Sequence, residues 1–147
     1  MNFEDVQHLL PASAKLFIQL IGLPRTVQLI QAWGGTTFPM SKNQRRLGQI
    51  RFEALAEVIG VDAAKVLTQH FGGETLAIPR CSAAILEMRN RAIREEFDEL
   101  IRTHSANHAA SELARKYHIT DRWVYQVLSR ADNHETTQAQ TSLFGHD

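Results

Sequence analysis

The sequence predicts a mainly helical protein with one or two short β-strands. Apolar residues recur at helical spacing over most of the 147 residues. A pattern of helix, glycine, helix and Gly-Gly occurs twice at a fixed separation. Near the end, a stretch has the form of two short helices joined by a tight turn. With 44% hydrophobic residues, the chain can bury a core.

Short breaks divide the N-terminal part into helices. Gly22 interrupts the helical pattern, and Pro24 suits the first turn of a new helix. Gly34 and Gly35 end that helix, and Pro39 restricts the strand that follows to a sheet edge. We therefore expect helices over Phe3–Leu10, Ala12–Ile21 and Thr26–Trp33, the last of them starting near Pro24, and a short strand over Thr36–Met40.

Ser41–Arg51 carries four basic residues and no acidic one. A solvated loop is the favoured interpretation of such a run. A contact of this basic run with a nucleic-acid phosphate backbone is the alternative. Another helix follows over Phe52–Ile59.

The stretch Ile21–Phe38 aligns without a gap on Ile59–Leu76. Each copy contains helix, Gly, helix, aromatic, Gly-Gly and a short strand. This similarity indicates a duplicated unit whose two copies pack together. Coincidence between two common helix stops is the alternative. If the copies are equivalent, their strands pair with each other or with those of a partner chain.

A long helix is expected between the second strand and the C-terminal motif. The strand covers Leu76–Pro79 and the helix covers Ser82–Ile101, with Thr103–His108 as a connection. The apolar members of the helix are Ile85, Met88, Ile93, Phe97 and Leu100. Its expected solvent face carries Arg89, Arg91, Arg94, Glu95, Glu96, Asp98 and Glu99. After Ala131 the chain is polar and aperiodic, which predicts a disordered tail.

The stretch Ala109–Arg130 predicts a helix-turn-helix. Its expected inner side carries Leu113, Ala114 and Tyr117 on the first helix, Ile119 in the turn, and Val124, Val127 and Leu128 on the second. Thr120 can cap the second helix. The turn position of His118 favours φ > 0, which glycine adopts more easily. An ordinary helical hairpin packed on a core is the alternative.

Charge is balanced overall, with 16 basic and 16 acidic residues, but not locally. Residues 101–131 contain five basic residues against two acidic ones, as a phosphate contact requires. The lone Cys81 excludes an internal disulfide, which fits a reducing cytoplasm. No signal peptide and no membrane-spanning stretch is recognised.

No enzyme signature, catalytic residue or cofactor motif is found. His104, His108 and Glu112 share a helical spacing, but exposed polar residues are favoured over a metal site. Cys81 is interpreted as a structural thiol, because no base is evident beside it. The Gly-Gly pairs lack the Lys and Ser/Thr of a phosphate loop.

The pieces IGVDAA, HFGGETLAIPR and ELARKYHITDRWVYQVL, in this order between Ile59 and Leu128, resemble the Mor family of phage middle-operon transcription activators. The resemblance implies a dimer with an N-terminal helical contact and a C-terminal helix-turn-helix. It implies a dimer contact at Gly72, Gly73, Leu76 and Ile78. The sequence departs from the family pattern in three places. The segment RTHSANHA before the first motif helix is longer, His118 stands where Gly is common, and the unit before Arg51 is additional.

We therefore predict a cytoplasmic, DNA-binding regulator, dimeric or larger, with RNA polymerase as a further partner. The expected domains are 1–81 for oligomerisation, 82–108 as linker, 109–131 for DNA and 132–147 as tail. Arg122 and Gln126 are expected at base edges. Trp123 is expected to pack at the edge of the motif, with sugar-phosphate contact as the alternative. The resemblance implies that Thr120–Gln126 begins the helix that reads the DNA. Phosphate contacts are expected from Arg115, Lys116, Tyr125, Ser129 and Arg130.

The tail contains a second signal, Gln140-Thr141-Ser142-Leu143-Phe144. It resembles the pentapeptide by which bacterial proteins bind the DNA polymerase sliding clamp. Leu143 and Phe144 would fill an apolar pocket, and Gln140 and Ser142 would bind at its rim. A pentapeptide is short, so chance is a serious alternative. An adaptor or inhibitor of the replication machinery is therefore the second hypothesis for function.

Overall fold

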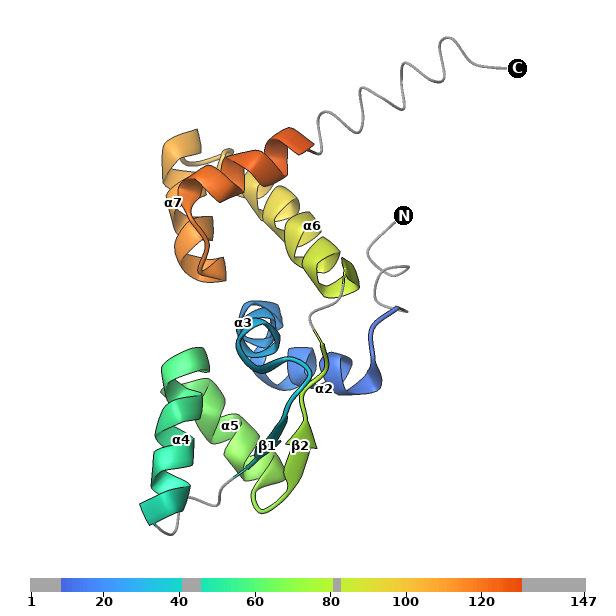
Figure 1. Cartoon of the computed structure of the whole chain (residues 1–147). Helices are drawn as coiled ribbons and strands as arrows, with labels where there is room; N and C mark the ends of the chain where they lie inside the picture. The colour runs from blue at the N-terminus through green and yellow to red at the C-terminus, as the bar shows by residue number, and fades with distance from the viewer. Residues whose placement is uncertain (1–8, 41–45, 81–82, 131–147) are drawn as a thin grey trace, which may run out of the picture. The chain divides into compact units, whose positions relative to one another are not determined.

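The computed structural model describes residues 9–40, 46–80 and 83–130. They form two compact units, Met1–Arg89 and Asn90–Asp147 (Figure 1). The fold is mainly helical with a small antiparallel sheet, as predicted. The elements are α2 (Ala12–Ile21), α3 (Leu23–Trp33), β1 (Thr37–Pro39), α4 (Arg46–Ile59), α5 (Val61–Phe71), β2 (Thr75–Ala77), α6 (Ala83–Leu100), α7 (Ala106–Tyr117) and a last helix over residues 121–130.

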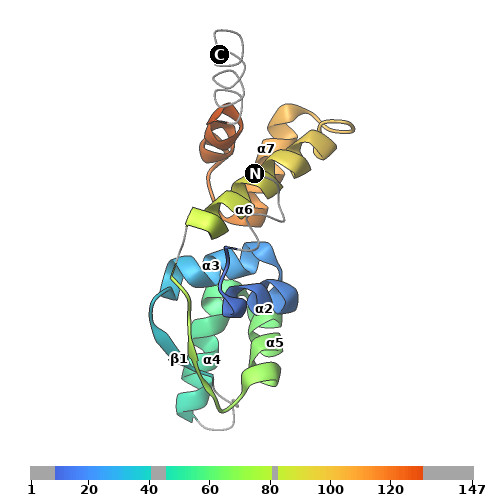
Figure 2. The same cartoon turned by 90° about the vertical axis from the view of Figure 1, so that its right-hand side faces the viewer.

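Glycine separates the helices of each pair in the first unit. Gly22 lies between α2 and α3 with φ 85°, and Gly60 lies between α4 and α5 with φ 91°. Side chains rarely adopt this left-handed region, so glycine ends one helix and lets the next begin at once. In Figure 2, α4 and α5 lie side by side, and the two helices contact each other.

The two strands pair with each other inside one chain, which is one of the two arrangements predicted. Thr37 faces Ala77, Phe38 faces Leu76 and Pro39 faces Thr75. Phe38 and Leu76 are the equivalent positions of the two aligned stretches, so this is the pairing expected about an approximate two-fold axis.

Hydrogen bonds around the sheet follow the same pattern. The amide of Gly35 donates to the carbonyl of Ile78 at 2.9 Å, and the amide of Gly73 donates to the carbonyl of Met40 at 2.8 Å. Gly35 and Gly73 are equivalent in the alignment of the two stretches, and Met40 and Ile78 are equivalent when it is extended. Each stretch therefore uses the second glycine of its Gly-Gly pair to donate the same hydrogen bond to the other stretch.

The core of the first unit joins its helices to the strands. The Phe17 ring of α2 meets the Phe71 ring of α5 edge-on, with centroids 6.0 Å apart. Trp33 stacks on Phe38 of β1 at 4.7 Å. The largest fully buried side chains here are Phe17, Leu29, Ile30, Leu55, Ile59, Leu67, Ile85, Met88 and Val27.

The interpretation of Ser41–Arg51 as a loop was wrong for residues 46–51, which form the start of α4. Arg, Leu and Gln are good helix formers, and a helix already anchored by buried Leu55 and Ile59 extends at low cost. Leu47 and Ile50 are more than half exposed, so burial is not what orders this first turn.

The second unit contains the α6 residues from Asn90 onward, α7 and the last helix. Its core lies among these three helices. The fully or nearly buried members are Ile93, Ala110, Leu113, Tyr117, Val124 and Val127. Phe97 and Leu100 of α6 pack against them. The second half of α6 therefore supplies a wall of this core.

Arg89 corrects the expected solvent face of the long helix. It was placed there by its charge, but its side chain is 4% exposed. Helical position decided the outcome, because Arg89 follows the buried Met88 and lies one helical turn from both Ile85 and Ile93, which are buried.

Some predicted features lie outside the described residues. These are most of the helix over 3–10, the thiol of Cys81 and the tail from residue 131 onward. Within the described ranges, no helix is long and apolar enough to cross a membrane.

Candidate nucleic-acid interface

The helix α7 begins at Ala106, one turn earlier than the motif predicted. Ser105 caps it, because the Ser105 hydroxyl accepts a hydrogen bond from the His108 amide at 3.1 Å. The interpretation of Thr103–His108 as a plain connection was therefore wrong for residues 106–108. The local signal was a serine placed one turn before His108.

The turn after α7 closes on one carbonyl. The amides of His118 and Ile119 both donate to the oxygen of Ala114. His118 adopts φ 55° and ψ 47°, the left-handed conformation that the sequence indicated at this position. Ile119 then packs into the core of the unit.

The last helix has its own cap. The Thr120 hydroxyl accepts from the Trp123 amide at 3.0 Å, as predicted. Asp121 accepts from the Arg122 amide at 2.8 Å, which places a carboxylate at the positive end of the helix dipole. Both ends of the turn are thus fixed by local hydrogen bonds.

One side of the last helix is buried and the opposite side is polar. Val124 and Val127 are at most 1% exposed, and Leu128 packs beside them. Arg122 and Ser129 are exposed on the opposite side, and Gln126 is half-buried. An exposed arginine and serine, with a half-buried amide between them on the same face, can donate hydrogen bonds to an acceptor-rich partner.

Tyr125, on the flank of this face, is bonded to α7. Its hydroxyl donates to Oδ1 of Asn107 at 2.7 Å. Both side chains are exposed. The sequence pattern did not single out Asn107, because the two residues lie on different helices and no helical spacing relates them.

The Trp123 ring packs against the core of the unit, which was the favoured prediction. Its face also contacts a positively charged side chain. The Arg130 guanidinium lies over the ring, 4.9 Å from its centroid. Such a contact restrains the arginine while leaving its charge exposed.

Glu96 of α6 ties that helix to α7. It accepts a 2.5 Å hydrogen bond from the Tyr117 hydroxyl and pairs with the ammonium of Lys116. Burial, followed by the bond to Glu96, raises the pKa of Tyr117 far above its ordinary value. Glu96 was predicted to be solvated, and no helical spacing indicated either partner.

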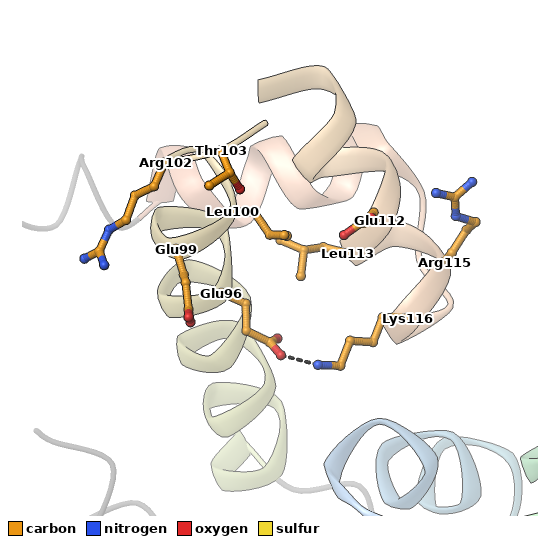
Figure 3. Close-up of a pocket in the computed structure, with 9 residues that line it drawn as sticks. All are labelled: Glu96, Glu99, Leu100, Arg102, Thr103, Glu112, Leu113, Arg115 and Lys116. Carbon is orange, nitrogen blue, oxygen red and sulfur yellow. Dashed lines mark hydrogen bonds and ion pairs between the residues drawn. The ribbon is translucent and has the colours of Figure 1, made fainter. Parts of the chain in front are cut away.

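A groove of about 740 Å³ lies beside this pair (Figure 3). Leu100 and Leu113 meet at its floor, while the guanidinium groups of Arg102 and Arg115 point away from it. The Arg115 charge is therefore presented to solvent, whereas Lys116 is neutralised by Glu96. The two neighbouring cations of α7 are not equivalent.

The histidines at the start of α7 form a local cluster. His104 stacks on His108 with ring centroids 4.5 Å apart, and His108 Nε2 lies 3.0 Å from Glu112 Oε1. Across residues 9–40, 46–80 and 83–130, no group of three or more His, Cys, Asp or Glu residues has the arrangement of a metal site.

The residues expected at a dimer contact lie in the first unit. Gly72 and Gly73 precede β2, Leu76 faces Phe38, and Ile78 is buried. The pentapeptide residues Gln140, Ser142, Leu143 and Phe144 lie outside the described part of the chain.

Comparison with known proteins gives a family match. The model of the Mor transcription activator family matches residues 25–143. The expectation that the chain before Arg51 stands apart from the family pattern was therefore wrong from Arg25 onward. No curated protein and no solved structure matches significantly.

Proposed function

The chain belongs to the Mor transcription activator family, and we propose that it regulates transcription by binding double-stranded DNA. In this proposal α7 and the last helix act as a helix-turn-helix, and the last helix lies in the major groove. The site of action is then the cytoplasm.

The observation that carries the proposal is the two-sided last helix. Val124 and Val127 anchor one side in the core, and Arg122 and Ser129 are exposed on the other. The Thr120 cap and the closed turn at His118 fix the direction of this helix. A rigid helix with exposed donors suits the acceptors at base edges and phosphates.

Base contacts are assigned to two residues of the polar side. Arg122, in the first turn, can pair with the two acceptors of guanine, and Gln126 can pair with adenine. Gln126 is half-buried, so its reach is shorter than that of Arg122. Arg122 is therefore the first candidate for sequence selectivity.

Phosphate contacts are assigned to residues at the edges of the motif. Arg115 and Ser129 are exposed, and the Arg130 guanidinium is restrained over Trp123. Lys116 takes second place, because Glu96 already compensates its charge. Such contacts fix the register of the protein on the duplex and carry no sequence information.

We also propose a division of labour between the two ends of the chain. Residues 1–81 associate the subunits into a homodimer or a larger oligomer, and RNA polymerase is a further partner. We propose that a contact between subunits at Gly72, Gly73, Leu76 and Ile78 uses the edge of β2 opposite β1, since β1 of the same chain pairs with the other edge.

The test is selection of bound DNA from a random pool, followed by substitution. Arg122→Ala should cost about 1–3 kcal/mol on the selected site and relax selectivity at one position. Arg130→Ala should weaken specific and random DNA alike and make binding less salt-sensitive. Lys65→Ala is the matched control, because it removes one positive charge from an exposed position of α5, outside the helix pair. Equal losses for Arg122→Ala on both DNAs would contradict the assignment.

A second partner, the bacterial sliding clamp, is proposed from the tail sequence alone. The apolar pair Leu143-Phe144 preceded by Gln140 and Ser142 supports it. An adaptor or inhibitor of replication would use this segment, and the helix pair would then make weak DNA or protein contacts.

A further inference from the structure

Tyr125 and Asn107 form a polar link between the last helix and α7. The hydroxyl of Tyr125 donates to Oδ1 of Asn107 at 2.7 Å. Both side chains are exposed, Tyr125 to 39%. The link lies on the flank of the side that presents Arg122 and Ser129.

The direction of this bond determines what each side chain can offer a phosphate. Phosphate oxygens accept hydrogen bonds, so the protein must donate. A tyrosine hydroxyl has one hydrogen, and here it is directed at Asn107. A carboxamide whose oxygen is occupied keeps two N–H donors. No described residue accepts a hydrogen bond from Nδ2 of Asn107.

We propose that Asn107 contacts the DNA backbone and that Tyr125 is its positioning residue. This inference rests on the proposed function, since it needs DNA against the polar side of the last helix. It moves the phosphate contact predicted for Tyr125 to Asn107. The Tyr125 hydroxyl holds the oxygen of the amide, so the two N–H groups remain available to a phosphate.

Two substitutions of Asn107 test the contact. Asn107→Ala removes the donors and should weaken binding about tenfold on selected and random DNA alike. The salt dependence should stay unchanged, because no cation is lost, whereas Arg115→Ala should lower its slope by about one. Asn107→Asp can still accept from Tyr125 but places a carboxylate beside the phosphate, so its loss should exceed that of Asn107→Ala.

A double-mutant cycle tests the positioning role. Tyr125→Phe removes the hydroxyl and keeps the ring, and should weaken binding several-fold in the parent protein. In the Asn107→Ala background it should have no further effect. Gln69→Glu, the same amide-to-carboxylate change at an exposed position of α5, controls for one added negative charge. Thermal unfolding of each variant confirms the folded state.

Each result bears on the proposal in one direction. Asn107→Asp binding as tightly as the parent would overturn the contact, and an equal effect of Tyr125→Phe in both backgrounds would overturn the positioning role. If either result is found while the parent protein still selects DNA and Arg122→Ala still weakens that binding, only the proposal for Asn107 and Tyr125 fails. If the parent selects no DNA, the proposed function fails as well.

Discussion

The phenol hydroxyl of Tyr117 in α7 lies 2.5 Å from Oε2 of Glu96 in α6 and donates a hydrogen bond to it. The other oxygen of Glu96 pairs with Lys116. One carboxylate thus holds two neighbouring residues of α7 against the long helix. Tyr117 is also part of the buried core of this unit, so its hydroxyl needs a partner.

Substitution of Tyr117 by Phe should lower the free energy of unfolding by about 1 kcal/mol, because the hydrogen bond to Glu96 is lost while the ring stays buried. Urea unfolding at neutral pH measures the difference. Glu96→Gln can still accept the hydrogen bond from the Tyr117 hydroxyl, but it removes the negative charge that pairs with Lys116. It should therefore lower the free energy of unfolding by less than Tyr117→Phe does. Equal stability of Tyr117→Phe and the parent would contradict a stabilising role for the bond.

The same pair predicts a loss of stability in alkali. The pKa of Tyr117 is raised in the folded state above its ordinary value of 10.0. A raised folded pKa contributes stability that is fully present below pH 10 and is lost as the pH rises above it, because the unfolded chain then gives up the proton more readily. The free energy of unfolding, measured between pH 8 and about 11, should decrease more steeply with pH for the parent than for Tyr117→Phe.

The cap at Thr120 should stabilise the start of the last helix. Thr120→Ala removes the acceptor of the Trp123 amide and should cost about 1 kcal/mol. Thr120→Ser keeps the hydroxyl and should restore most of the loss. The measurement is thermal unfolding of the three proteins. If Ala and Ser variants are equally stable, the cap does not hold this helix.

Replacing His118, the residue with a left-handed backbone in the turn, by glycine should stabilise the protein. His118 is the non-glycine residue with positive φ among the described residues, and glycine adopts this conformation without a clash of Cβ. His118→Gly should raise the free energy of unfolding by up to about 1 kcal/mol and leave DNA affinity unchanged. His118→Ala, which keeps a Cβ, should give no such gain; a gain as large as that of glycine would refute the explanation.

The protein should form a homodimer or a larger homo-oligomer. A single helix-turn-helix on a chain with zero formal charge makes few phosphate contacts, so useful affinity needs two motifs on one DNA. We expect at least a dimer and a protected site with two half-sites about one helical turn apart. Light scattering and footprinting measure both. A monomer at micromolar concentration, free and on DNA, would contradict the expectation.

The tail pentapeptide should bind the purified sliding clamp with a dissociation constant on the order of micromolar, because a short peptide motif buries little surface and loses conformational freedom on docking. A chain ending at Thr137, and the double substitution Leu143→Ala with Phe144→Ala, should lose this binding and keep DNA affinity. Thr136→Ala is the control outside the pentapeptide. Calorimetry without heat for the parent protein would end the hypothesis.

The sequence by itself determined the features that depend on local chemistry. Gly22 and Gly60 marked helix boundaries because the left-handed backbone there excludes side chains. Thr120 marked a cap, and Val124 with Val127 marked a buried side, because both signals act within one or two helical turns. The family resemblance came from the same local pieces, and the family match bears it out.

Only the tertiary structure decided which distant groups meet. The pairing of Phe38 with Leu76 inside one chain, the bonds of Glu96 to α7 and the link from Tyr125 to Asn107 join residues that are far apart in the sequence. Hydrophobic periodicity defines which side of a helix is buried, but not which neighbour covers it, because burial is non-directional. Packing of the helices selects those partners, and with them the polar contacts at the edge of the candidate interface.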